Sequence, residues 1–279
     1  VGTSSRYSSL TESVKKKLQR LLAFLIFLYF LPVLLTYGVM TYASQSSFDQ
    51  SPLAKEAYAL HIPSGLQTPL TLDWYPKMHI YYNGYQPLSE GASPCDLTIY
   101  YTYGDFDLYA RNSTLYHSDS PYFSAFYGAY VLHNEDLTRL SDEALAGRLL
   151  EVSRYDYLRL VSDALYNQDA PFVVASSTLE RSIPFLESND WIKLTATVAT
   201  EGFNHAYSPK HFSLSYLQYG LPTLGKAQPY LPVTLYATTY VHYEERLHAT
   251  VALYVISTSP EVNDRTVTAF LAKTTLTKT

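Results

Sequence analysis

The strongest pattern along the chain is an uninterrupted apolar run near its start. Residues 21–40 read LLAFLIFLYFLPVLLTYGVM and contain no charged side chain. A helix of about 20 apolar residues is long enough to cross a hydrocarbon core of about 30 Å. The run therefore predicts a transmembrane anchor over residues 21–43. Pro32 lies within it and predicts a kink rather than a break, because spanning helices tolerate proline.

Basic residues directly before this run predict its orientation. Lys15, Lys16, Lys17 and Arg20 precede the apolar stretch, and positively charged flanks stay in the cytoplasm. The main part of the chain is then extracytoplasmic. A cleaved signal peptide ending before Ser44 is the alternative, but the apolar region of a signal peptide is usually about 7–15 residues long. The longer run favours an uncleaved signal-anchor, and both interpretations place the rest of the chain outside the cytoplasm.

The pattern divides the chain into four parts. Residues 1–20 form a basic cytoplasmic segment and residues 21–43 the single-pass anchor. Residues 44–70 are polar and contain three prolines, which predicts a linker or stalk. Residues 71–279 are predicted to form the extracytoplasmic domain.

The domain is predicted to be rich in strands. From Thr71 onward, short runs of Tyr, Ile, Val and Thr alternate with turn residues, as is typical of strands. Asn83-Gly84 is a strong hairpin-turn signal, and Glu244-Glu245-Arg246 is predicted to be the turn of a long hairpin. The predicted strands cover residues 78–82, 97–103, 123–132, 172–175, 191–200, 212–219, 233–243 and 247–258, with a last edge strand over 266–271.

Helical signals occur in the middle of the domain. Ser141 is a suitable N-cap, and Asp142 and Glu143 suit the positive end of a helix dipole. Two helices over residues 141–151 and 154–166, or one kinked helix, are predicted. Strands followed by helices and then by further strands favour an α+β fold with a mainly antiparallel sheet.

Composition changes the picture in two respects. The net charge is −5, and residues 1–20 carry +4, so the rest of the chain carries −9 and the predicted domain is acidic. An acidic domain is a poor partner for nucleic acid. Tyrosine is unusually frequent, with 28 residues among 279. Exposed tyrosines give amphipathic contact area at low entropic cost, which suits binding to a glycan or to another protein.

Strand alternation selects the candidate binding residues. Tyr236 and Tyr240 are predicted to project from the face opposite the apolar row of the long hairpin, and Tyr254 to join them from the second arm. The competing interpretation is that tyrosine is simply a good strand former with a polar tip.

Few motifs in the sequence indicate catalysis or cofactor binding. The sequence has no glycine-rich nucleotide loop, no nucleophile elbow and no zinc-binding helix motif, so no cofactor and no metal is expected. Asp105-Phe106-Asp107 resembles the start of a calcium loop, but the positions that need glycine and glutamate hold Ala110 and Tyr116. Cys95 is the single cysteine, so no intramolecular disulfide can form.

These observations favour a non-enzymatic, membrane-anchored binding or assembly domain that contacts another envelope protein or a glycan through tyrosine-rich surfaces. An accessory subunit of a larger membrane complex is one alternative. The other is an anchored hydrolase acting on envelope material, for which His117, Asp119, His205 and His211 are the candidate residues.

Overall fold

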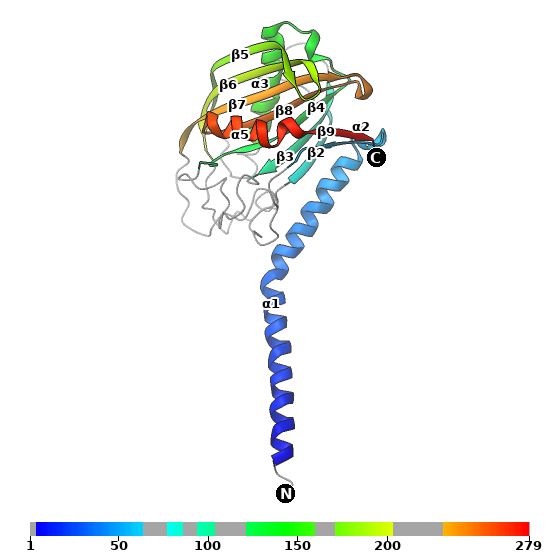
Figure 1. The fold of residues 1–279 in the computed structure, drawn as a ribbon, viewed down its shortest axis with the longest axis vertical. Coiled ribbons are helices and arrows are strands. Elements are labelled where there is room, and N and C mark those ends of the chain that lie inside the picture. Colours follow the sequence, from blue (N-terminus) through cyan, green and yellow to red (C-terminus); the bar gives the residue numbers. More distant parts are fainter. Residues whose placement is uncertain are drawn as a thin grey trace. The chain divides into compact units, whose positions relative to one another are not determined.

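The computed structural model describes residues 4–63, 77–85, 94–103, 121–159, 171–202 and 231–278. The chain divides into two compact units, Val1–Val39 and Met40–Thr279. Helix α1 (Ser4–Asp49) contributes to both (Figure 1).

The first unit consists of the larger part of α1. Its apolar side chains from Leu21 to Leu28 are exposed. Within the part of the chain that the structure describes, no helix combines the length and the apolar content that a membrane crossing requires. The anchor over residues 21–43 stays a prediction.

The second unit contains the end of α1 and all the remaining elements. The longer helices are α3 (Asp142–Arg159) and α5 (Pro260–Ala269). Short helical segments are α2 (Pro52–Lys55), η2 (Leu137–Arg139), η5 (Glu245–Leu247) and η6 (Leu271–Lys273). The strands are β1 (Tyr58–His61), β2 (Lys77–Tyr85), β3 (Cys95–Tyr103), β4 (Phe126–His133), β5 (Phe172–Phe185), β6 (Ser188–Glu201), β7 (Pro232–Glu244), β8 (Ala249–Ser257) and β9 (Thr275–Lys278).

The strands form one large and one small antiparallel sheet. The large sheet has seven strands in the order β2-β3-β4-β8-β7-β6-β5, and β1 pairs with β9 in the small one. The predicted α+β class with a mainly antiparallel sheet is confirmed. The hairpin of β7 and β8 is also confirmed, with η5 at its turn.

Both faces of the large sheet are covered along its central strands. One face packs against α3, and its buried residues include Tyr101, Tyr130 and Tyr254. The opposite face packs against α5, α2 and the β1–β9 pair, and includes Tyr100 and Tyr127. Figure 1 shows α3 and α5 on opposite sides of the sheet. This two-sided burial explains why β4 and β8 are buried at every position.

The end of α1 closes one edge of the large sheet. The backbone N–H groups of His79 and Tyr81 on β2 donate hydrogen bonds to the hydroxyls of Ser44 and Ser47, each over 2.8 Å. An open strand edge is a template for pairing with another chain. The two serines satisfy these outward donors. At the other end of the sheet, β5 is the edge strand and is exposed along most of its length.

Three local predictions differ from the structure. Residues 44–63, where a linker was expected, belong to the second unit: Leu53 is 1% exposed and β1 pairs with β9. Asn83-Gly84 is not a turn but part of β2, where the register shifts by one residue and Gly84 adopts a φ of +67°. The carboxylate of Asp96 accepts hydrogen bonds from the Gly84 N–H and the Tyr81 hydroxyl and holds this bulge in place.

The prediction of a strand over residues 266–271 is wrong. Helix α5 occupies most of this range because Ser259 caps its start, Pro260 occupies its first turn and Glu261 follows. The middle helix is a single element, α3, and the hydroxyl of Ser141 accepts a hydrogen bond from the Ala144 N–H as its predicted cap. The predicted strand over residues 212–219 lies outside the described residues.

Tyrosines provide much of the core. Tyr130 and Tyr254 stack with ring centroids 4.3 Å apart. The carboxylate of Asp156, which is 2% exposed, accepts hydrogen bonds from the hydroxyls of Tyr101 and Tyr130. These bonds satisfy the phenols that the packing buries, since an unpaired buried polar group is costly.

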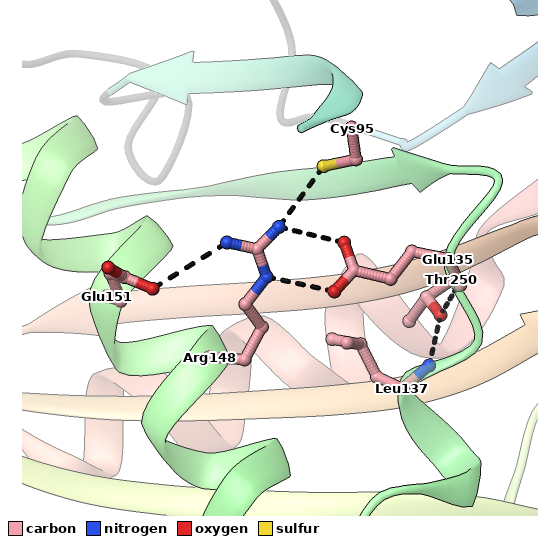
Figure 2. A network of polar contacts seen from close by, with 6 residues as sticks. All are labelled: Cys95, Glu135, Leu137, Arg148, Glu151 and Thr250. Atoms are coloured by element: carbon pink, nitrogen blue, oxygen red, sulfur yellow. Dashed lines mark hydrogen bonds and ion pairs between the residues drawn. The ribbon is translucent and has the colours of Figure 1, made fainter. Parts of the chain in front are cut away.

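A partly buried ion pair joins α3 to the segment after β4. Figure 2 shows the Arg148 guanidinium donating to both carboxylate oxygens of Glu135, over 3.0 and 2.8 Å, and to the Cys95 sulfur over 3.3 Å. The Glu151 carboxylate lies 3.6 Å from the same guanidinium, close enough for an ion pair. The Thr250 hydroxyl then connects the Glu135 carbonyl with the next turn of the chain. This network holds the end of the sheet to α3.

Candidate binding groove

A groove lies beside the first turn of α5, where the sheet continues past the helix. Helix α5 packs over β8 and part of β7, whereas β5 and β6 extend beyond it. The resulting hollow has a volume of about 280 Å³. It is lined by Ser176, Thr178, Lys193, Thr195, Ala196, Thr197, Tyr236, Ala237, Thr238, Pro260, Asn263 and Asp264.

The floor of the groove follows from the strand register. Ser176, Thr197 and Tyr236 lie side by side on β5, β6 and β7. The next row consists of Thr178, Thr195 and Thr238. Side chains of paired residues project from the same face of a sheet, so these two rows bring hydroxyl groups together on one surface. The hydroxyls of Thr178 and Thr195 are 2.6 Å apart.

A third row adds charge and a second aromatic ring. Glu180 pairs with Lys193, which pairs with Tyr240. Burial raises the pKa of the Tyr240 phenol, and the carboxylates of Asp264 and Glu180 raise it further. The phenol therefore stays protonated and lies within the electrostatic reach of both carboxylates. Tyr240 is only 9% exposed, and its ring stacks on Phe185 at 3.9 Å.

The wall of the groove is positioned by one buried amide. Asn263 on α5 is 2% exposed. Its side-chain N–H donates to the carbonyl of Tyr236 over 2.9 Å, and its side-chain oxygen lies 2.7 Å from the hydroxyl of Ser257. The start of α5 is thereby fixed against β7 at the position from which the Tyr236 side chain projects. Asp264, the next residue, reaches the groove.

The structure separates the three tyrosines predicted to bind. Tyr236 is half-buried and lines the groove. Tyr240 is on the same face of β7 but mostly covered. Tyr254 does not join them: it is fully buried and pairs with Thr239, so it lies on the opposite face. The turn between β7 and β8 sets which face Tyr254 occupies. Glu244 pairs with Ala249, and this register places Tyr254 opposite Thr239 and not opposite Tyr236 or Tyr240.

Sequence reasoning missed most of the groove. The alternation of Thr195 and Thr197 with apolar neighbours indicated that they share a face. It did not indicate that a helix borders that face, because no element was predicted over residues 260–265 and a strand was expected over residues 266–271. The cap formed by Ser259 and Pro260 was the signal that could have revealed the wall.

A second hollow of about 650 Å³ lies near the other end of β5–β7. Its arginines are already paired: Arg139 lies 2.7 Å from Asp136, Arg181 lies 2.6 Å from Asp142, and Arg246 lies 2.8 Å from Glu244. These ion pairs leave the three guanidinium groups poorly suited to recruit an anionic ligand.

The same hollow contains an Asp–His pair. Asp190 lies 3.2 Å from His242 and accepts a hydrogen bond from Ser188, which, together with His242, lowers the pKa of the carboxyl. A hydrolytic triad requires the imidazole between the hydroxyl and the carboxylate. Here the carboxylate lies between the other two groups, so the arrangement is not that of a triad.

Other sequence candidates fall elsewhere. His117, Asp119, His205 and His211 lie outside the described residues, as does the calcium-like stretch that begins at Asp105. Within the ranges that the structure describes, no group of three or more His, Cys, Asp or Glu residues is placed to hold a metal ion. The expectation that the chain uses no metal and no cofactor stays a prediction.

Comparisons with known proteins give no relative. No protein-family model matches the chain, and searches of curated proteins and of solved structures found no match. The function is therefore inferred from the residues of the chain itself.

Proposed function

We propose that the chain is a membrane-anchored, extracytoplasmic and non-enzymatic binding domain. Its binding surface is the groove beside Tyr236, and its partner is a glycan or another protein of the cell envelope. The single observation that carries this proposal is the asymmetry of the sheet. Both faces are covered along β4 and β8, while the β5–β7 face forms an open, polar hollow against α5.

The anchor is supported by sequence and exposure. Side chains at Leu21, Leu22, Phe24, Leu25, Ile26, Phe27 and Leu28 are between 43% and 56% exposed on α1. A contiguous exposed apolar surface is typical of contact with a membrane or another protein. Lys15, Lys16, Lys17 and Arg20 precede it and favour a cytoplasmic N-terminus.

The state of the reactive side chains supports binding rather than catalysis. Cys95 is buried, and burial together with Glu135 raises the pKa of its thiol to about 12. A nucleophilic cysteine needs the thiolate form, and this thiol stays protonated at neutral pH. The ring of His242 stacks on Trp191 at 4.9 Å, and its imidazole contacts Asp190.

The binding role is tested by crosslinking from the groove in living cells. A photoreactive phenylalanine analogue replaces Tyr236 in the full-length chain, and the matched control carries it at Tyr243. Both tyrosines are half-buried on β7, but they project from opposite faces. We expect illumination to attach a partner to the chain substituted at position 236 and not to the control. Equal yields from the two positions, or none from either, would refute the role of the groove.

A separate experiment tests whether the domain is extracytoplasmic and anchored in the membrane. Protease added to intact cells should digest residues beyond 44 in the wild-type chain, and alkaline carbonate should not release the protein from the membrane fraction. Protection of the domain until the cells are permeabilised would refute the extracytoplasmic placement.

A further inference from the structure

We infer that the groove binds a neutral, hydroxyl-rich glycan, with one sugar ring seated beside Tyr236. The inference rests on the proposed function and specifies the ligand of the same site. It is carried by three features of the groove: the spacing of its hydroxyls, its balance of charge and the exposure of one aromatic ring.

The sheet holds the serine and threonine hydroxyls of the groove at regular spacings. Adjacent strands of a sheet lie about 4.8 Å apart, and successive residues on one face are about 6.6 Å apart along a strand. Ser176 and Thr197 share one row, and Thr178, Thr195 and Thr238 share the next. Each hydroxyl can both donate and accept a hydrogen bond. Such a rigid array matches a ligand whose own hydroxyls are spread over a ring and likewise donate and accept.

The charges in the groove balance. Among the described residues that line it, Lys193 is the one cationic side chain and Asp264 the one anionic side chain. Glu180 is the register neighbour of Lys193 on β5 and is not among the described residues that line the groove. A phosphorylated or sulfated ligand is held by clustered arginines and lysines, which the described lining of the groove does not provide. Lys193 and Asp264 instead offer one strong donor and one strong acceptor to an uncharged polyol.

Tyr236 supplies the aromatic surface. Its ring is half-buried at the edge of the groove, and its backbone is held by the amide of Asn263. A tyrosine ring presents a flat apolar face and a phenol at its tip. A sugar ring needs both, because it has an apolar C–H face and hydroxyls at its rim.

A protein partner fits the same surface less well. Protein interfaces are organised around apolar or aromatic anchors that become fully desolvated. The floor of this groove consists largely of threonine and serine side chains, and its volume of about 280 Å³ suits a sugar ring better than a folded protein surface.

The test uses the full-length chain in mild detergent and a defined panel of neutral oligosaccharides. The panel contains oligomers of glucose in α-1,4 and β-1,4 linkage, of N-acetylglucosamine, of mannose and of galactose. Dextran sulfate and alginate are the anionic comparators. We expect saturable binding to at least one neutral oligomer, with an affinity that changes little with salt, and none to the anionic polymers.

Isosteric variants show whether binding uses the groove. Thr195→Val combined with Thr197→Val removes two hydroxyls but keeps side-chain shape and strand preference. Loss of two hydrogen bonds should weaken binding about tenfold or more, and Tyr236→Ser should weaken it by a similar factor. Thr275→Val on β9 is the control, because Thr275 is exposed and lies away from the groove. It should bind as the wild type does.

The outcomes separate this inference from the proposed function. If none of the neutral oligosaccharides binds, the inference is overturned. Equal binding by the wild-type chain and the double valine variant also overturns it. Crosslinking of a protein from position 236, without glycan binding, would overturn the inference and leave the binding function standing. Failure of both experiments would overturn both.

Discussion

His133 is expected to make the stability of the domain depend on pH. It lies near the end of β4, is 2% exposed, and contacts the Thr98 hydroxyl through Nε2 at 2.9 Å. Its Nδ1 has no hydrogen-bond partner among the described residues. Burial lowers the pKa of this imidazole from its ordinary value of 6.5 to about 4, although Asp96 opposes the shift. The ring is therefore neutral in the folded protein at neutral pH.

The direction of the effect follows from the pKa values of the two states. The unfolded chain protonates His133 near pH 6.5, whereas the folded chain does so only near pH 4. Between these values the unfolded state binds more protons, so folding stability is full above pH 6.5 and falls as the pH decreases. Linkage between these pKa values gives a loss of about 2.5 kcal/mol between pH 7.5 and pH 4.5.

The measurement is urea unfolding of the full-length chain in mild detergent at both pH values. Relative to the wild type, His133→Asn should reduce the change in unfolding free energy between the two pH values by about 2.5 kcal/mol. Thr98→Val is the control, because it removes the hydrogen bond and leaves the titrating group. It should lower stability by about 1 kcal/mol at pH 7.5 and keep most of the wild-type slope. An unchanged slope in His133→Asn would show that the imidazole is not the source.

Two further sets of substitutions test two glycine positions and the Arg148–Glu135 ion pair. An added Cβ at Gly128 would lie 1.7 Å from the Tyr100 carbonyl oxygen, so Gly128→Ala should prevent stable folding. An added Cβ at Gly147 would have nothing within 4 Å, so Gly147→Ala should raise the unfolding free energy by about 0.5–1 kcal/mol. Similar melting temperatures for the two variants would contradict this reasoning. Arg148→Met leaves the partly exposed Glu135 carboxylate without its guanidinium partner and should cost about 2 kcal/mol in urea unfolding. Adding Glu135→Gln should restore about 1 kcal/mol, and no restoration would show that the ion pair is not the cause.

The sequence alone determined the fold class and most of the strands. Alternation along β7 identified the apolar row of the long hairpin, and the structure buries this row on the face that packs against α3. Ser141 marked the start of α3. These features depend on neighbours in the chain, so local periodicity and capping residues are enough to predict them.

Only the tertiary structure decided which residues share the groove. Ser176, Thr195 and Tyr236 come from three strands, and Asp264 comes from the start of a helix that the sequence had not predicted. Their meeting depends on the order of the strands, on the register across each pair and on the placement of α5 by Asn263. A shift of one residue in register moves a side chain to the other face. For that reason Tyr254 lies in the core, although sequence alternation had grouped it with Tyr236.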